Sequence, residues 1–253
     1  MNSIGEIDEW RNQRPASWLL TMNTRGLFIT GTDTDVGKTY VAALIAQQLT
    51  ADGISVGAYK PACSGSELDE AGRPIWRDVE ILAGAIGTKE SCERICPQCF
   101  AAALAPPVAA QREGRVVDTR LLRDGARWWD GRVDVLIVEG VGGWLCPISE
   151  NETVADVAAD LGYPVLIVAR LGLGTINHTL LTIESIKRRG LSVAGIILNE
   201  CERGGPKLEA ETNPGEIARR SGCPVLAVVR PDDTPQTFAD RNQNRIDFGQ
   251  VAQ

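Results

Sequence analysis

The stretch that decides the fold is Gly31-Thr32-Asp33-Thr34-Asp35-Val36-Gly37-Lys38-Thr39, which directly follows an apolar run at 27–30 and precedes a helix-patterned segment at 38–51. This strand–loop–helix order is typical of a phosphate-binding loop, in which backbone N–H groups surround a β-phosphate and the helix N-terminus adds partial positive charge. Lys38 would reach the β- and γ-phosphates, and Thr39 would ligate Mg²⁺. Five residues separate Gly31 from Gly37, one more than in the usual pattern, so the loop is a variant.

A carboxylate at the end of a second strand supports this interpretation. The apolar run at 133–138 ends in Glu139 and continues as Gly140-Val141-Gly142-Gly143. Ligands of doubly wound sheets gather at the carboxyl ends of the strands, so we expect Glu139 beside the loop, holding a metal directly or through water. The glycines would let the backbone approach a ligand closely. An acidic residue that merely closes a strand is the alternative.

Short β-branched apolar runs alternate with segments of helical spacing along the chain. Runs that are apolar on both faces suit a buried parallel sheet. We therefore predict an α/β fold with a doubly wound, mainly parallel sheet and helices on both faces. Strands are expected at 27–30, 54–59, 135–138, 165–169, 193–198 and 225–229, and helices at 38–51, 78–84, 119–129, 154–161, 176–189 and 214–220.

Composition narrows the class of protein. The 253 residues carry a net charge of −7, which supplies no diffuse attraction for nucleic acid. His178 is the only histidine, so histidine-rich zinc sites are excluded and a Ser-His-Asp triad has one candidate. Seven cysteines and an acidic N-terminus favour a reducing, cytoplasmic compartment. The apolar runs are too short to span a membrane, which takes about 20 residues.

The loop run resembles that of the dethiobiotin synthetase family, whose pattern is Gly-Thr-Asp-Thr-Glu-Val-Gly-Lys-Thr. Four further stretches agree in order and spacing: Tyr59-Lys60-Pro61 with Ser64-Gly65-Ser66 and then Asp78; Glu139-Gly140 with Gly142-Gly143-Trp144; Ile176-Asn177-His178; and Gly195 with Asn199. The resemblance covers residues 26–231. It implies a single ligase domain there, with an N-terminal extension at 1–25 and a C-terminal tail at 232–253.

The resemblance implies a reaction as well as a fold. Members of this family close the ureido ring of dethiobiotin, in biotin biosynthesis, from 7,8-diaminononanoate, CO₂ and Mg-ATP. One amine captures CO₂ as a carbamate, a carbamate oxygen attacks the γ-phosphorus, and the second amine attacks the resulting carbamic–phosphoric anhydride. Negative charge accumulates during these steps, so positioned cations are the expected catalytic tools.

Site residues follow by motif. Lys38, Lys60 and Thr34 would be catalytic, with Lys60 and Thr34 also touching the carbamate, and Ser64 would bind the carbamate or an amine. Thr39, Asp78 and Glu139 would hold Mg²⁺, and Asn199 would bind adenine. Nucleotide contacts are expected from Asp35, Val36, Gly37, Lys38, Thr39, Tyr40, Asp78, Glu139, Gly140, Val141, Gly142, Asn199 and Glu200. Three of these residues have a simpler alternative role. Lys60 could be a solvent-facing lysine at a strand end, Ser64 an ordinary loop serine, and Asp78 a residue that caps a helix.

The start of another predicted helix, near residues 174–177, is relevant to whether the protein forms a dimer. Free N–H groups at the start of the helix near Gly174, Thr175 and Asn177 suit a carboxylate. In the family this segment grips the substrate's carboxylate across a two-fold interface, so the resemblance implies a homodimer with shared sites. Asn177 could instead be an ordinary helix residue, and we expect His178 to be structural rather than catalytic.

Three departures from the family pattern bear on detail. Asp35 stands where the family has Glu, Val141 replaces a smaller Ala, and residues 227–231 lack the usual Gly-x-Ile-Pro run. Cys92, Cys96 and Cys99 have the spacing of an iron–sulfur site but lie in the family's variable middle segment, so we expect no metal there.

Two other functions remain as alternatives, a regulatory ATPase and a relative of the cobyrinate-type amide synthetases. A nucleotide switch has no need for a lysine and a hydroxyl, Lys60 and Ser64, aimed past the γ-phosphate. Partition ATPases carry an extra lysine where this chain has Asp33. An amide synthetase would need a glutaminase Cys–His pair, for which the chain offers no attached domain.

Overall fold

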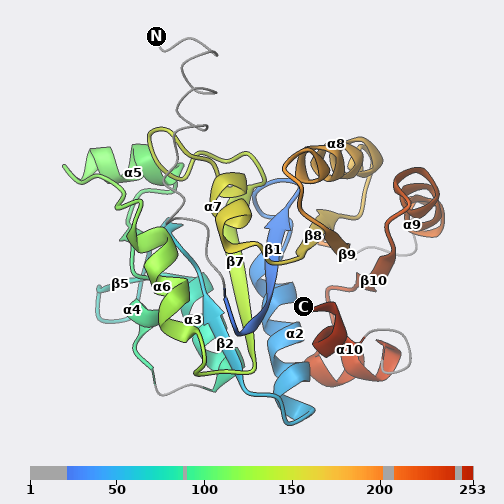
Figure 1. Cartoon of the computed structure of the whole chain (residues 1–253), viewed down its shortest axis with the longest axis horizontal. Coiled ribbons are helices and arrows are strands. Elements are labelled where there is room, and N and C mark those ends of the chain that lie inside the picture. The colour runs from blue at the N-terminus through green and yellow to red at the C-terminus, as the bar shows by residue number, and fades with distance from the viewer. Residues whose placement is uncertain (1–21, 88–89, 202–207, 243–246, 253) are drawn as a thin grey trace.

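The structure is a computed structural model that describes residues 22–87, 90–201, 208–242 and 247–252. Within these ranges a six-stranded sheet forms the centre of the molecule, in the order β10-β9-β8-β1-β7-β2 (Figure 1). Every neighbouring pair in it is parallel, which confirms the predicted mainly parallel sheet. From one edge the strands are β2 (Val56–Tyr59), β7 (Val135–Gly143), β1 (Arg25–Gly31), β8 (Val165–Arg170), β9 (Val193–Asn199) and β10 (Val225–Val229).

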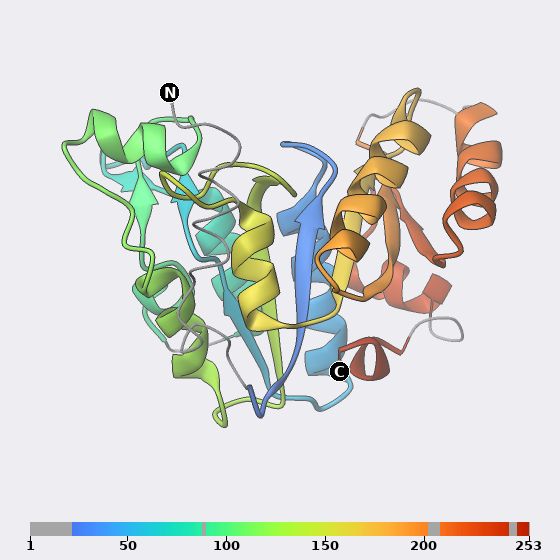
Figure 2. The same ribbon diagram turned by 45° about the horizontal axis from the view of Figure 1, so that its top comes forward.

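Helices cover both faces of this sheet, as a doubly wound fold requires (Figures 1 and 2). One face carries α6 (Leu121–Trp129), α7 (Val154–Leu161), α8 (Thr175–Arg188) and α9 (Leu208–Ser221). The other carries α2 (Lys38–Ala51), α10 (Pro235–Asn242) and α11 (Phe248–Val251), with α3 (Arg77–Ile86) beside α2. Phe28 and Ile29 of β1 are completely buried because both of their faces are covered.

Apart from α3, which was predicted at 78–84, the segment between β2 and α6 is built from short elements that the sequence pattern did not predict. It contains β3 (Cys63–Ser64), β4 (Glu67–Leu68), β5 (Pro74–Ile75), α4 (Cys92–Ile95), β6 (Cys99–Phe100) and α5 (Pro106–Arg112). β3 pairs in parallel with β6, and β4 pairs antiparallel with β5. Strands of two residues show too little alternation to be recognised from a single sequence. This segment forms one wall of the site described below.

Two long elements differ from their predicted bounds. β7 continues through the glycines to Gly143 instead of ending before Glu139, because Gly31 of β1 still pairs with Gly143. α9 begins at Leu208 and holds Pro214 in its interior, whereas the sequence predicted that this proline begins the helix. Proline is common in a first helical turn, which is why the prediction placed it there.

The segment after Asp232 packs against the domain rather than running as an unstructured tail. Phe238 of α10 and Phe248 of α11 are buried and stack with ring centroids 6.3 Å apart. The Arg25 guanidinium donates to the backbone oxygen of Gly249 at 2.8 Å. The Tyr40 hydroxyl, in the first turn of α2, donates to the backbone oxygen of Asp233. The C-terminal helices therefore support the helix that begins at the phosphate-binding loop.

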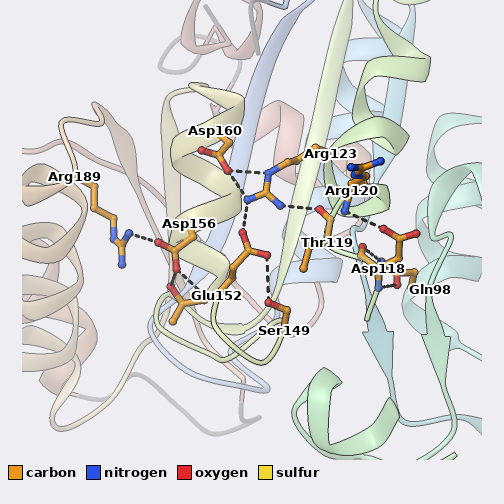
Figure 3. A network of polar contacts seen from close by, with 11 residues as sticks. Gln98, Asp118, Thr119, Arg120, Arg123, Ser149, Glu152, Asp156, Asp160 and Arg189 are labelled. Atoms are coloured by element: carbon orange, nitrogen blue, oxygen red, sulfur yellow. Dashed lines mark hydrogen bonds and ion pairs between the residues drawn. The ribbon is translucent and has the colours of Figure 1, made fainter. Parts of the chain in front are cut away.

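A buried ionic network joins α6, α7 and the loop that follows β7 (Figure 3). The Arg123 guanidinium donates from Nε to Asp160 at 2.8 Å and from Nη2 to Glu152 at 2.5 Å. Its Nη1 donates to the backbone oxygen of Thr119 at 2.7 Å. Glu152 also accepts from the Ser149 hydroxyl at 3.2 Å. The network fixes the loop that returns from β7, and with it the carboxyl end of that strand.

Candidate active site

The phosphate-binding loop has the geometry that its sequence predicts. It joins β1 to α2, whose first turn has no side-chain cap and no acidic residue, so its N–H groups are available to an anion. Gly37 has φ of 89°, and a Cβ there would lie 2.0 Å from the Asn199 amide nitrogen. Both the backbone conformation and the close approach therefore require glycine.

Lys38 folds back over the loop, where its ammonium donates to the backbone oxygen of Asp33 at 3.1 Å. Burial lowers the pKa of Lys38, and the neighbouring Lys60 adds to this effect, while Glu139 opposes it. A buried lysine next to a second cation is best stabilised by an anion with several charges. The loop therefore holds its lysine in a state that favours a polyphosphate.

Lys60 lies between two carboxylates from different elements. Its ammonium is 2.5 Å from Glu139 Oε1, at the β7 strand, and 2.7 Å from Asp78 Oδ2, in the first turn of α3. Burial alone would lower the pKa of Lys60, but Glu139 and Asp78 outweigh it and raise that pKa, so the ammonium stays charged. Burial likewise acts to raise the pKa of Asp78, and Lys60 reverses this and lowers it.

Thr39, Asp78 and Glu139 come together as a set of oxygen donors. The Thr39 hydroxyl donates to Glu139 Oε1 at 2.8 Å, and Glu139 Oε2 is buried without a hydrogen-bond partner. A hydroxyl and two carboxylates are the ligands that Mg²⁺ prefers, and an unpartnered buried carboxylate oxygen calls for a cation. These residues therefore fit a magnesium site beside the phosphate-binding loop.

A cavity of about 670 Å³ extends from the loop to the segment between β2 and α6. Most of the predicted site residues line it, namely Thr34, Asp35, Gly37, Lys38, Thr39, Tyr40, Lys60, Ser64, Asp78, Glu139, Val141 and Gly142. Its far wall was not predicted from the sequence and consists of Cys63, Ile81, Ala103, Leu104, Ala105 and Pro106, together with Cys146. The Ala-Pro-Pro run that begins α5 marks a helix start, but nothing in the sequence assigns it to a site.

Other predicted nucleotide residues lie just outside this cavity. The Asn199 amide donates to the backbone oxygen of Val36 at 3.0 Å, so it supports the loop in this structure. The Glu200 backbone N–H bonds to Val229 at 2.8 Å, at the end of β10. Gly140 is buried beneath the site, where a Cβ would lie 2.8 Å from Val154. Asn199 thus supports the loop from behind, and adenine binding by Asn199 stays a prediction.

Gly174, Thr175 and Asn177 do not reach the cavity of their own chain. Gly174 caps α8 with φ of 90°, Asn177 is exposed, and the buried Thr175 hydroxyl has no hydrogen-bond partner. A separate groove of about 430 Å³ runs along α8 past His178 and shares Thr34 with the main cavity. The start of α8 therefore faces outward, away from the reacting groups of the same subunit.

No helix within the described residues is long and apolar enough to cross a bilayer. Nor do those residues contain a cluster of three or more His, Cys, Asp or Glu side chains able to hold a metal ion. Cys92 is exposed on α4 while Cys96 is buried, so the three cysteines of that spacing do not converge.

Comparison with known proteins gives a consistent result. A family model described as an AAA domain matches residues 25–236. The chain is 48% identical over 207 residues to the ATP-dependent dethiobiotin synthetase BioD of Anaeromyxobacter dehalogenans strain 2CP-C, covering 81% of this chain and 89% of that protein. It is 39% identical over 218 residues to the protein of the same name from Rhodopirellula baltica, covering 82% and 85%. Among solved structures, a ParA family ATPase from Chlorobium tepidum has a TM-score of 0.49 at 15% identity, covering 87% of this chain and 94% of that one.

Proposed function

The chain belongs to the family of ATP-dependent dethiobiotin synthetases, and we propose that it closes the ureido ring of dethiobiotin from 7,8-diaminononanoate, CO₂ and ATP. The observation that carries this proposal is the extent of the cavity. It continues past the phosphate-binding loop to Lys60, Ser64 and an apolar wall, which leaves room for a second substrate beyond the γ-phosphate. A protein that only bound nucleotide would need no such space.

The nucleotide side is provided by the loop and α2. Backbone N–H groups from Gly37 onward bind the phosphates, and Lys38 neutralises the transferring phosphoryl group. Asp35, with φ of 55°, holds the left-handed turn within the loop, which a short carboxylate side chain tolerates. Thr39, Asp78 and Glu139 would hold Mg²⁺, which would neutralise charge on the triphosphate when bound.

The diamine side is provided by β2, β3 and the α5 start. One amine adds to CO₂ and loses a proton to give a carbamate, whose negative charge faces the Lys60 ammonium. The raised pKa of Lys60 keeps this group protonated, which is the state that stabilises an anion. Ser64, half-buried at the cavity, can donate to the carbamate or accept from an amine. Ile81 and Leu104 line the same space and suit the methylene chain.

Ring closure then follows from these positions. A carbamate oxygen attacks the γ-phosphorus and ADP leaves; the second amine attacks the carbamic carbon and expels phosphate. Thr34 lines the cavity at the loop, where its hydroxyl can bind the carbamate. The chain's contribution is to hold two anions face to face between Lys38 and Lys60.

A homodimer in the cytoplasm completes the proposal. The start of α8, near Gly174 and Asn177, offers backbone N–H groups to a carboxylate but lies outside its own cavity, and the Thr175 N–H there already donates to the Gly172 oxygen at 3.3 Å. A partner subunit could place the same segment over the open end of the cavity. The substrate's carboxylate would then be bound by one subunit and its amines by the other.

Product analysis tests the function directly. Purified protein is incubated with 7,8-diaminononanoate, bicarbonate and Mg-ATP, and dethiobiotin is sought by mass spectrometry. We expect dethiobiotin, ADP and phosphate in equal amounts, and none without bicarbonate. ATP hydrolysis that proceeds at the same rate without the diamine, with no dethiobiotin formed, would instead identify a nucleotide switch.

A further inference from the structure

Three cysteines gather behind Lys60, and the proposed reaction uses none of them. Cys63 lies in β3 and Cys99 in β6, where they are opposite each other in the parallel pairing. Cys96 directly follows α4 and lies three residues before Cys99, where β6 begins. All three are free thiols. The cluster differs from the one that sequence spacing suggests, because Cys63 replaces Cys92.

Cys96 and Cys99 are the closest partners within this cluster. They enclose the dipeptide Pro97-Gln98, and the two thiols are near enough for each to shift the other's pKa. Each sulfur also faces the backbone of this stretch: Cys99 Sγ lies 3.7 Å from the Cys96 oxygen, and Cys96 Sγ lies 3.6 Å from the Gln98 oxygen. Two cysteines on either side of the bend at Pro97, with both sulfurs against the backbone of that stretch, are placed to form a disulfide after a local rearrangement.

The environments of the two thiols differ in the way that an exchange reaction requires. Cys99 is half-buried, and its pKa is lowered by the neighbouring Cys96 thiol and by the Arg115 guanidinium. Arg115 is held there by a bond from Nη1 to the Cys99 backbone oxygen at 3.0 Å. Cys96 is buried and its pKa is raised, chiefly by burial. Cys99 is therefore the attacking thiolate and Cys96 the resolving thiol.

Cys63 is the alternative partner, since it lies opposite Cys99 in the β3–β6 pairing and burial raises the pKa of its thiol to about 12, as burial raises that of Cys96. We assign Cys96 because it lies in the same bend as Cys99, where its backbone oxygen is 3.7 Å from Cys99 Sγ. The cluster also lacks the geometry of a metal site, as no group of three such ligands in the described part of the chain could hold an ion. A dithiol that is neither a metal site nor part of the ligase chemistry remains.

We propose that Cys96 and Cys99 form a redox-active dithiol, oxidised to an intramolecular disulfide by exchange with a small soluble disulfide. The Cys99 thiolate attacks one sulfur of the soluble disulfide, whose S–S bond breaks and releases a thiolate. Cys96 gives its proton to solvent and attacks Cys99 Sγ, which releases the second thiolate. The protein dithiol loses two electrons and the soluble disulfide is reduced to two thiols.

The bend is bonded to the segment that carries the proposed substrate residues. The Lys60 N–H donates to the Ile95 oxygen at 2.7 Å, Cys63 N–H to the Gln98 oxygen at 2.9 Å, and Gly65 N–H to the Phe100 oxygen at 3.0 Å. A disulfide that tightens the bend would move the acceptors of these bonds. It would thus displace Lys60 and Ser64 but leave the phosphate-binding loop, which joins β1 to α2, in place.

Intact mass and peptide mapping after treatment with oxidised glutathione test the dithiol itself. We expect the wild-type chain to lose two hydrogens and yield a Cys96–Cys99 cross-linked peptide. C96S should instead retain glutathione on Cys99, because the resolving thiol is absent, and C99S should form no cross-link in this bend. The surface control C92S should give the wild-type cross-link. A Cys63–Cys99 cross-link, or a C96S chain that carries no glutathione at Cys99, would overturn the proposal.

A second measurement tests the link to the site, and it rests on the proposed function. Oxidised wild-type protein should bind a non-hydrolysable ATP analogue as the reduced protein does, while ring closure falls about tenfold to a hundredfold and returns with dithiothreitol. C99S should be insensitive to oxidised glutathione. Equal turnover by oxidised and reduced protein would refute the coupling, whereas a protein that makes no dethiobiotin in either state would refute the ligase and leave the mass result standing.

Discussion

Lys60 leaves β2 with its ammonium between Asp78 and Glu139, and it is 2% exposed. We predict that Lys60→Met lowers dethiobiotin formation by about 10²-fold or more, since loss of a positioned charge typically has this effect. Steady-state turnover with the diamine measures it. Lys187→Met, which changes an exposed lysine on α8, should leave turnover within about twofold of the wild type. Full turnover by the Lys60 variant would remove this residue from the mechanism.

The raised pKa of the buried Cys63 thiol leads us to predict that the protein loses stability at alkaline pH. Burial raises the pKa of this thiol from 9.0 to about 12, so between these values the native chain holds a proton that the unfolded chain has released. The contribution of Cys63 to the free energy of unfolding is therefore fully present below pH 9. It falls as pH rises toward 12, by up to about 1.4 kcal/mol per pH unit. Urea unfolding at several pH values measures the slope. Cys63→Ala should make it shallower, and Cys92→Ala, at an exposed thiol, should not.

Between elements, the Arg123 network makes a prediction about stability. Arg123 is 2% exposed and binds two buried carboxylates, Glu152 and Asp160. Arg123→Met would leave both without their cation, so we expect a loss of about 3–5 kcal/mol in the free energy of unfolding. The matched control is Arg127→Met on the same helix, which breaks an exposed pair with Asp124 and should cost under about 1 kcal/mol. Denaturant titration compares them, and equal losses would contradict the argument.

The elements also show how far the sequence alone could lead. α7 has its predicted bounds because Thr153 and Asp156 form a capping box and Gly162 ends the helix, all local signals. The end of β7 was misjudged because its glycines pair with β1, a contact made by residues distant in sequence. β3 and β6 were missed for the same reason, since each exists only through the other. Local rules thus predicted helices better than strand pairing.

Across the whole molecule, the site gathers residues that lie more than a hundred positions apart in the sequence, such as Thr34 and Cys146. Thr39 and Glu139 meet because β1 and β7 are neighbours in a parallel sheet, whose carboxyl ends share one edge. The motif order predicted this grouping, and most of the predicted residues line the cavity. The apolar wall from α5 and Ile81 was not predicted, because apolar side chains in irregular segments carry no signal of what they face.

The proposed homodimer makes the last prediction, since its sites should be shared. If Lys60 of one subunit acts with Asn177 of the other, a mixed dimer of Lys60→Met and Asn177→Ala chains contains one site with both defects and one with neither. Each variant alone should be impaired. Equal amounts, co-refolded so that subunits exchange at random, should regain about a quarter of wild-type dethiobiotin formation, because half of the dimers are mixed and each has one intact site. Size-exclusion chromatography confirms the dimers. Activity that stays at the mean of the two separate variants would show that each cavity works with residues of its own chain.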